Sequence, residues 1–270
     1  MSDQGEYEVL IVKYGARSTV RSDVFLNYGL YHEPDAPIGM DYFCWVVRNE
    51  SQTVIVDTGF SAAGGAVRGR TMLIDPRDAL AGLGIYPVDE PIVVVTHAHY
   101  DHIGNLAHFS SSPVVIARDE VEFWTGPHAK HPLFHHSVED SELRALADVV
   151  DEGRATLFDD RHVVADGIEV IQVGGHTPGQ SVVLVRTADG PVLLASDAVH
   201  YYEECDKDMP FVSVASLVDM YAGFEKVRTM TADGTVAHVV SGHDPATLGR
   251  FAAAGGPAGA QVAVIGGRRS

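Results

Sequence analysis

The sequence has few cysteines and no long hydrophobic run. Its two cysteines, Cys44 and Cys205, are too few for a disulfide framework. Cys44 lies in an apolar run and is expected to be a buried small hydrophobe, whereas Cys205 lies in an acidic stretch and is expected to be exposed or half-buried. Neither belongs to a metal motif, so a catalytic thiol is not favoured. No apolar run approaches the roughly 18 residues of a membrane-spanning helix.

Basic residues are also scarce. Lysine and arginine number 19 against 37 aspartates and glutamates, which gives a formal net charge of −18. Binding nucleic acid requires Lys/Arg clusters that neutralise phosphates, and the sequence offers only Arg268-Arg269 near the end of the chain. We therefore expect no nucleic-acid partner and favour a small neutral or weakly charged substrate.

The N-terminal residues do not resemble a signal peptide, because residues 1–6 are acidic and a strand-like segment follows them. We therefore expect a cytoplasmic protein with no membrane partner. The 46% hydrophobic content is that of an ordinary soluble globular chain. The sequence does not determine the oligomeric state, and a homodimer stays open.

Residues 93–105 are V-V-V-T-H-A-H-Y-D-H-I-G-N. The β-branched run at residues 93–96 is followed at once by four metal-binding side chains. The valines predict a buried strand, and loops at strand ends are where scaffolds present chemistry. His97, His99, Asp101 and His102 offer imidazole and carboxylate, the ligand set of zinc and neighbouring first-row metals. Because His97 and His99 share one side and the adjacent pair projects apart, two metals suit the four groups better than one.

The alternative reading is that these are ordinary core or surface histidines, as single histidines usually are. Four ligand-type residues within six positions, directly after a buried strand, make that alternative weak.

Four further segments complete a recognisable pattern. G-G-H-T-P-G at residues 174–179, L-L-A-S-D ending at Asp197 and V-V-S-G-H-D at residues 239–244 follow the H-x-H-x-D-H motif in order. V-I-V-D-T-G at residues 54–59 precedes it. In order and in context these motifs resemble those of the metallo-β-lactamase superfamily. The resemblance covers most of the chain, from about residue 42 to residue 244.

The resemblance implies an α/β fold, the αββα sandwich of this superfamily, in which two mixed β-sheets are flanked by helices. Residues 1–270 are expected to form a single domain of this type.

The resemblance also implies a centre of two divalent metal ions. Zinc is expected, with iron, manganese or cobalt as alternatives. Two adjacent cations can share a water and lower its pKa, so a bridging hydroxide would attack a substrate carbonyl while Asp101 shuttles a proton. Asp57 would support the ligands from behind. The implied ligands are His97, His99 and His176 for one metal, Asp101, His102 and His243 for the other, and Asp197 as the bridge.

Among the activities of this superfamily, the sequence is most similar to the N-acyl-homoserine-lactone lactonases. These place a Tyr three residues after the bridging Asp, where it contacts the lactone. Here that position is His200, followed by Tyr201, and we name both as catalytic candidates. An ordinary surface role for His200 stays open. The expected reaction is hydrolysis of a lactone, a cyclic carboxylic ester.

Other activities fit less well. Glyoxalase-II-type thioesterases share all seven ligands, but their C-terminal helical region is missing here, so a thioesterase or another small-molecule esterase remains the alternative. Exported β-lactamases commonly use a Cys where Asp197 stands, and persulfide dioxygenases use a single iron.

Two segments are expected to be pocket or lid inserts. Residues 14–40 form a loop-rich insert, and residues 124–137 combine four histidines with prolines that break regular structure. We favour a mobile, partly aromatic lid over an extra metal site for the second. Residues 252–260 are a low-complexity, flexible tail segment. The side chains expected to line the substrate pocket are Tyr28, Tyr31, Trp124 and Phe134.

Overall fold

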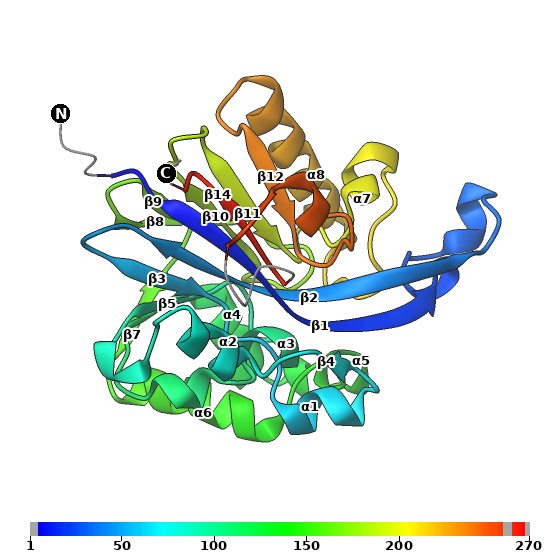
Figure 1. Ribbon diagram of the computed structural model, residues 1–270. Coiled ribbons are helices and arrows are strands. Elements are labelled where there is room, and N and C mark those ends of the chain that lie inside the picture. The colour runs from blue at the N-terminus through cyan, green and yellow to red at the C-terminus, as the bar shows by residue number, and fades with distance from the viewer. Residues whose placement is uncertain (1–4, 256–260, 268–270) are drawn as a thin grey trace.

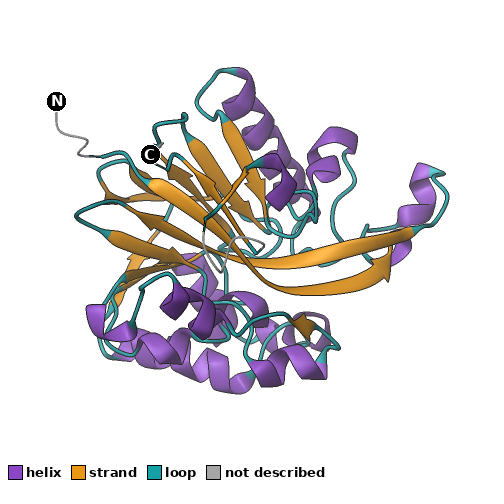
Figure 2. Ribbon diagram, viewed as in Figure 1, coloured by secondary structure: helices purple, strands orange, loops and turns teal. Residues whose placement is uncertain are grey.

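The computed structural model describes residues 5–255 and 261–267 (Figure 1). Two β-sheets pack face to face, and helices cover the outer side of each sheet (Figures 1 and 2). This arrangement confirms the predicted αββα sandwich. No helix in the described ranges is long and apolar enough to cross a membrane.

The first sheet contains both parallel and antiparallel strands. Strands β3, β5, β6 and β7 run parallel, and the short Val/Ile runs of β3, β5 and β6 are mostly buried because helices cover one face and the second sheet covers the other. The remaining neighbours pair antiparallel. In spatial order the sheet comprises β13 (Ala252–Ala253), β14 (Val262–Ile265), β1 (Glu8–Val20), β2 (Pro37–Arg48), β3 (Thr53–Val56), β5 (Ile92–Val95), β6 (Val114–Ala117) and β7 (Ala155–Phe158), with β4 (Thr71–Met72) paired to β1.

The second sheet is smaller, and its strands β11 and β12 run parallel while the others pair antiparallel. Its apolar inner face packs against the first sheet through a buried cluster that includes Trp45, Val94 and Val183. In spatial order it comprises β12 (His238–Ser241), β11 (Val192–Ser196), β10 (Ser181–Val185), β9 (Ile168–Gln172) and β8 (Arg161–Ala165).

The helices form the two outer layers. The second sheet carries α7 (Tyr202–Lys207) and α8 (Leu217–Ala232), while the first carries α1 (Ala62–Val67), α2 (Pro76–Gly82), α3 (Tyr100–Ile103), α4 (Arg118–Thr125), α5 (Pro132–His135) and α6 (Asp140–Asp151) (Figure 1). Short 3₁₀ helices are η1 (Arg21–Asp23), η2 (Tyr28–Tyr31), η3 (Pro87–Asp89), η4 (Leu106–Phe109), η5 (His128–Lys130) and η6 (Leu248–Arg250).

The predicted loop-rich insert at residues 14–40 is only partly correct, because residues 14–20 and 37–40 are strand and only residues 21–36 between them are loops, turns and 3₁₀ helices. Strand β1 continues to Val20 and β2 begins at Pro37, so the two form a long hairpin whose tip projects at the right of Figure 1. The pairing register shifts between Lys13 and Gly15. This bulge interrupts the alternation of side chains, and the polar residues beyond it hid the strand from sequence reasoning.

The predicted flexible tail at residues 252–260 is also partly wrong. Ala252–Ala253 forms β13 against β14, and β14 in turn pairs with β1. Residues 256–260 lie outside the described residues. Cys44 is buried and Cys205 is half-buried, as expected.

Candidate metal centre

The predicted metal-binding residues lie where strands end. His97 and His99 follow β5, and Asp197 and His243 follow β11 and β12. Helix α3 carries Asp101 and His102, and His176 lies in the turn between β9 and β10. All seven side chains are buried. Two sheets that face each other therefore bring together residues separated by up to 146 positions in the chain, from His97 to His243.

The seven side chains form two groups with ligand atoms in close reach. One group is His97, His99, His176 and Asp197, and the other is Asp101, His102 and His243; within each, the ligand atoms lie within 4.8 Å of one another. They are the only such groups among the described residues, and neither includes a histidine of residues 124–137. The structure therefore gives no support to the extra metal site considered for that segment.

Asp197 lies between the two groups. Its Oδ2 is 3.7 Å from Nε2 of His97 and 3.3 Å from Nε2 of His176. Its Oδ1 is 3.3 Å from Nε2 of His102 and 3.2 Å from Nε2 of His243. One carboxylate thus faces both sets of imidazoles with different oxygens, which is the arrangement that a bridging ligand requires.

Hydrogen bonds orient the imidazoles from behind. Nδ1 of His102 lies 2.7 Å from Asp57, and Nδ1 of His176 and of His243 each lie 2.7 Å from a backbone carbonyl. Such contacts fix the tautomer and turn the other ring nitrogen inward. Buried Nε2 atoms of His97, His102 and His243 and Oδ1 of Asp197 have no hydrogen-bond partner in the described structure. Unpartnered nitrogen and carboxylate donors that converge in this way fit a divalent metal.

The protonation states of His97, His99 and His176 agree with this fit, whereas the carboxylates of Asp197 and Asp57 raise the pKa of His102 well above its usual value despite its burial. Burial lowers the pKa of His97 and His99 well below the usual value, and it lowers that of His176 to about 3. These imidazoles are therefore neutral and able to donate a lone pair. Despite its burial, the Asp197 carboxyl has a pKa well below its usual range, because imidazoles including His243 and His102 surround it.

His200 is fully buried, so the alternative that it is an ordinary surface residue is wrong. Its Nε2 lies 3.1 Å from Oδ2 of Asp197, and its Nδ1 lies 3.3 Å from Oε1 of Glu204. Burial disfavours the charged imidazole, but the Asp197 and Glu204 carboxylates raise the pKa of His200 to about 9. The ring stacks on Phe211, with centroids 3.9 Å apart.

Tyr201 is placed differently from its neighbour. Its hydroxyl donates to the carbonyl of Gly39 at 3.0 Å, and its ring packs against Phe25.

The four predicted pocket residues separate into two sets. The Trp124 indole meets the His99 ring edge to face at 5.6 Å, and Phe134 joins it indirectly through Phe123. Tyr28 and Tyr31 lie on the hairpin tip, where their hydroxyls donate to backbone carbonyls of Pro34 and Asp208.

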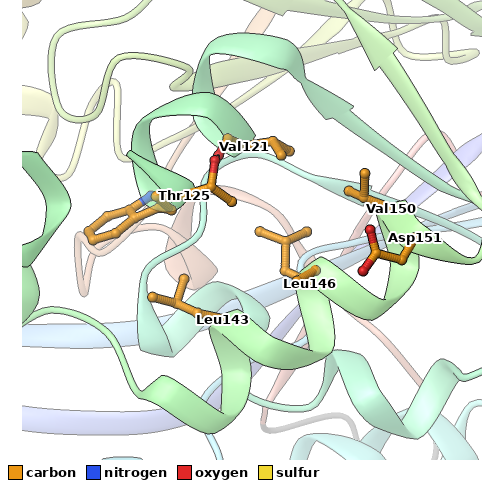
Figure 3. A pocket seen from close by; sticks show the side chains of 8 residues that line it. Val121, Thr125, Leu143, Leu146, Val150 and Asp151 are labelled. Carbon is orange, nitrogen blue, oxygen red and sulfur yellow. The ribbon is translucent and has the colours of Figure 1, made fainter. Parts of the chain in front are cut away.

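Trp124 belongs to α4 and is buried, which corrects its assignment to an irregular lid. It also lines a small apolar pocket of about 90 Å³ between α4 and α6, whose other walls include Val121, Leu143 and Leu146 (Figure 3). Trp124 therefore contacts both His99 and the helical layer.

Glu120 is a buried residue that sequence reasoning missed. Its Oε1 accepts hydrogen bonds from the amide of Ala98 and the indole of Trp124, both at 2.7 Å. Its Oε2 accepts from the Thr177 hydroxyl at 2.6 Å and from the Gly179 amide at 3.0 Å. One carboxylate therefore joins the loop of His97 and His99 to the turn of His176. An acidic residue in the first turn of a helix is usually a solvated end group, so no local pattern indicates this role.

Residues 39–222 match the family described as the metallo-beta-lactamase superfamily. The chain belongs to this superfamily. Several relatives carry the name N-acyl homoserine lactonase, among them proteins of Bacillus sp and Azorhizobium caulinodans. That of Bacillus sp is 24% identical over 227 residues, which cover 78% of this chain and 81% of the relative. That of Azorhizobium caulinodans, AttM, is 33% identical over 170 residues, 60% of this chain and 61% of the relative, so less than two thirds of its length is matched.

Solved structures share the fold over almost the whole chain. A quorum-quenching N-acyl homoserine lactone lactonase aligns with a TM-score of 0.75 at 18% identity, covering 91% of this chain and 95% of that one. AidC, a dizinc quorum-quenching lactonase, aligns with a TM-score of 0.71 at 19% identity, covering 90% of each chain.

Proposed function

We propose that this protein is a metal-dependent hydrolase that opens a lactone, a cyclic carboxylic ester, with N-acyl homoserine lactones and related rings as the substrate class. The observation that carries the proposal is Asp197, whose two oxygens face two complete groups of buried ligands. The similarity to proteins named N-acyl homoserine lactonase supports a lactone ring as the substrate group that is opened.

The proposed cofactor is a pair of divalent metal ions, with zinc as the first candidate because one structural neighbour is a dizinc lactonase. One ion would be held by His97, His99 and His176 and the other by Asp101, His102 and His243, with Asp197 between them. When bound, such ions supply a water of lowered pKa and polarise the substrate carbonyl.

The chain's own residues would orient the substrate and move protons. His200 has an inward Nε2 beside Asp197, held by Glu204, and can donate a hydrogen bond to the ester. Asp101 would carry a proton to the departing oxygen. The buried walls around Trp124 and His99 would exclude bulk water.

The test is proton release by the zinc-loaded protein on a panel of lactones, with a thioester and a β-lactam alongside. We expect lactone turnover that is lost in Asp197→Asn. Thioester turnover with inert lactones would contradict the proposal and favour a glyoxalase-II-like thioesterase on the same ligands.

A further inference from the structure

A polar groove of about 450 Å³ lies between the hairpin and the short segment that leads into β4. Its lining includes Arg17 and Thr19 of β1, Asp23 of η1, and Arg70. The one acidic residue named here, Asp23, accepts the Thr19 hydroxyl at 3.3 Å.

The two arginines of this groove differ from most others in the protein. Arginines such as Arg21, Arg48 and Arg68 form ion pairs with carboxylates. Within the described part of the chain, neither Arg17 nor Arg70 forms one. The Nε of Arg17 is buried and has no hydrogen-bond partner among the described residues. In a chain of net charge −18, two guanidinium groups without carboxylate partners in one groove require a reason.

Arg17 lies on the face of the hairpin that looks toward the metal centre. It pairs with Met40 across the strands, and two residues away Gly15 pairs with Tyr42. Paired positions, and positions two apart, present their side chains to the same face of a sheet. On this face a Cβ at Gly15 would collide with the Phe60 ring, and the Tyr42 ring lies 5.0 Å from that of His243, so the face is packed and adjoins the metal centre.

A single side chain, that of Tyr42, separates Arg70 from the ligand cluster. Its Cζ lies 6.0 Å from the centroid of the Tyr42 ring, and that ring lies 5.0 Å from the ring of His243. These two separations put Arg70 Cζ at most 11 Å from the His243 imidazole. Its Nε also donates to the hydroxyl of Tyr100, the residue between His99 and Asp101, at 3.1 Å.

We propose that the groove of Arg17 and Arg70 binds a carboxylate of the substrate, so that the preferred lactone carries an ionised acid on its side chain. Guanidinium groups match carboxylates in charge and in planar geometry. The inference rests on the proposed function, since it names the substrate class of that same site. The overall charge of the chain favours a neutral or weakly charged substrate. The inference changes this expectation to a substrate with one negative charge, because the local charge of the groove is positive.

The first test compares a lactone that bears a side-chain carboxylate with the corresponding primary amide, using zinc-loaded protein. We expect kcat/KM to be higher for the acid by about tenfold or more, as for a charge-assisted hydrogen bond. Arg17→Met and Arg70→Met should lower the rate on the acid by a much larger factor than the rate on the amide, and Arg17→Lys should keep part of the preference. The control is Arg144→Met, which removes an exposed charge on α6. Equal rates for the two substrates, or equal losses on both, would overturn the inference.

A second measurement separates this inference from the proposed function. Calorimetric titration of the zinc-loaded protein with glutarate and with its monoamide needs no turnover. We expect tighter binding of glutarate in the wild type and no difference in Arg17→Met. If no lactone is hydrolysed but this difference is found, the groove stands and the lactonase proposal fails. Equal affinities of the wild type for glutarate and for its monoamide would overturn the inference that the groove binds a carboxylate.

Discussion

The carboxylate of Asp57 lies 2.7 Å from Nδ1 of His102. The same carboxylate accepts the amide of Thr96 at 2.8 Å and its hydroxyl at 2.7 Å. The Thr96 hydroxyl in turn lies 2.8 Å from that of Ser196, on the opposite sheet. Asp57 therefore orients a candidate ligand and also belongs to a polar chain that joins the two sheets beside the metal centre.

Replacing Asp57 by Asn should weaken metal binding. The amide cannot hold the His102 imidazole as a carboxylate does, and loss of such a contact typically costs about 10–100-fold in metal affinity. Competition with a fluorescent zinc chelator would measure the affinity. Asp78→Asn, an exposed change on α2, is the control. An unchanged affinity in Asp57→Asn would show that His102 needs no support from Asp57.

Replacing Glu120 by Gln should destabilise the protein and slow the reaction together. The amide nitrogen would face donors where an oxygen now accepts, at a cost of about 1–3 kcal/mol in the free energy of unfolding. The loop of His97 and the turn of His176 would lose their common anchor, so kcat should fall as well. Urea unfolding and steady-state kinetics check the two effects. Glu122→Gln, exposed on the same helix, should change neither.

Glu142 should make stability depend on pH. Burial raises the pKa of this carboxyl from 4.5 to about 7, and its Oε2 has no hydrogen-bond partner among the described residues. A raised carboxyl pKa means that the folded state binds the proton more tightly. The contribution is therefore fully present below about pH 4.5 and is lost as the pH rises to about 7.

The variant Glu142→Gln should remove this dependence. The free energy of unfolding of the variant minus that of the wild type should increase by on the order of 2 kcal/mol when the pH is raised from 4.5 to 8. Urea titrations at the two pH values, at equal metal occupancy, give the measurement. A difference between the two proteins that does not vary with pH would contradict the assignment.

Replacing His200 by Phe should lower kcat without removing the metals. Phenylalanine retains the stacking on Phe211 but loses the nitrogen that faces Asp197. We expect a decrease of about tenfold or more, the loss of one hydrogen bond to a charged or reacting group. Metal content and kcat would be measured together, with the exposed His108→Phe as control. Wild-type kcat would exclude a catalytic role for His200.

Replacing Arg21 by Met should loosen the hairpin tip. Arg21 pairs with Glu33 at 2.9 Å and with Glu203 of α7 at 2.7 Å, and it donates to the Tyr28 hydroxyl at 2.6 Å. Without these contacts the tip should open more often and be cut faster by a protease of low specificity. Arg228→Met removes a more exposed set of ion pairs and serves as the control. Equal cleavage rates would show that apolar packing alone holds the tip.

Strand ends and ligand types could be predicted from the sequence, because both depend on residues that are neighbours in the chain. Val93 to Val95 are apolar and β-branched, and His97 to His102 follow at once, so the strand and its ligands were foreseen together. The helix at Pro76–Gly82 carries equally local signals, a capping Asp75 and a proline in its first turn.

Features that depend on distant partners could not be predicted in this way. The strand character of residues 14–20 comes from pairing with residues 37–42 and is masked by the bulge near Gly15. Ala252–Ala253 is a strand only because Val262–Ile265 offers it an edge. Glu120 has its role because four donors from three segments converge on it, and its helix alone carries no sign of them.

The long β1–β2 hairpin supplies none of the candidate metal ligands, so substrate preference and metal binding depend on different parts of the molecule. Every candidate metal ligand follows another strand, and the hairpin contacts the cluster through the Asp41 carbonyl, the Tyr14 hydroxyl and the Tyr42 ring. Hairpin side chains other than Tyr14 and Tyr42 can therefore change without altering the ligand set. Successive substitutions in these two strands could shift an enzyme of this architecture from one substrate to another while its hydrolytic chemistry persists, which makes the hairpin a natural first target for laboratory evolution.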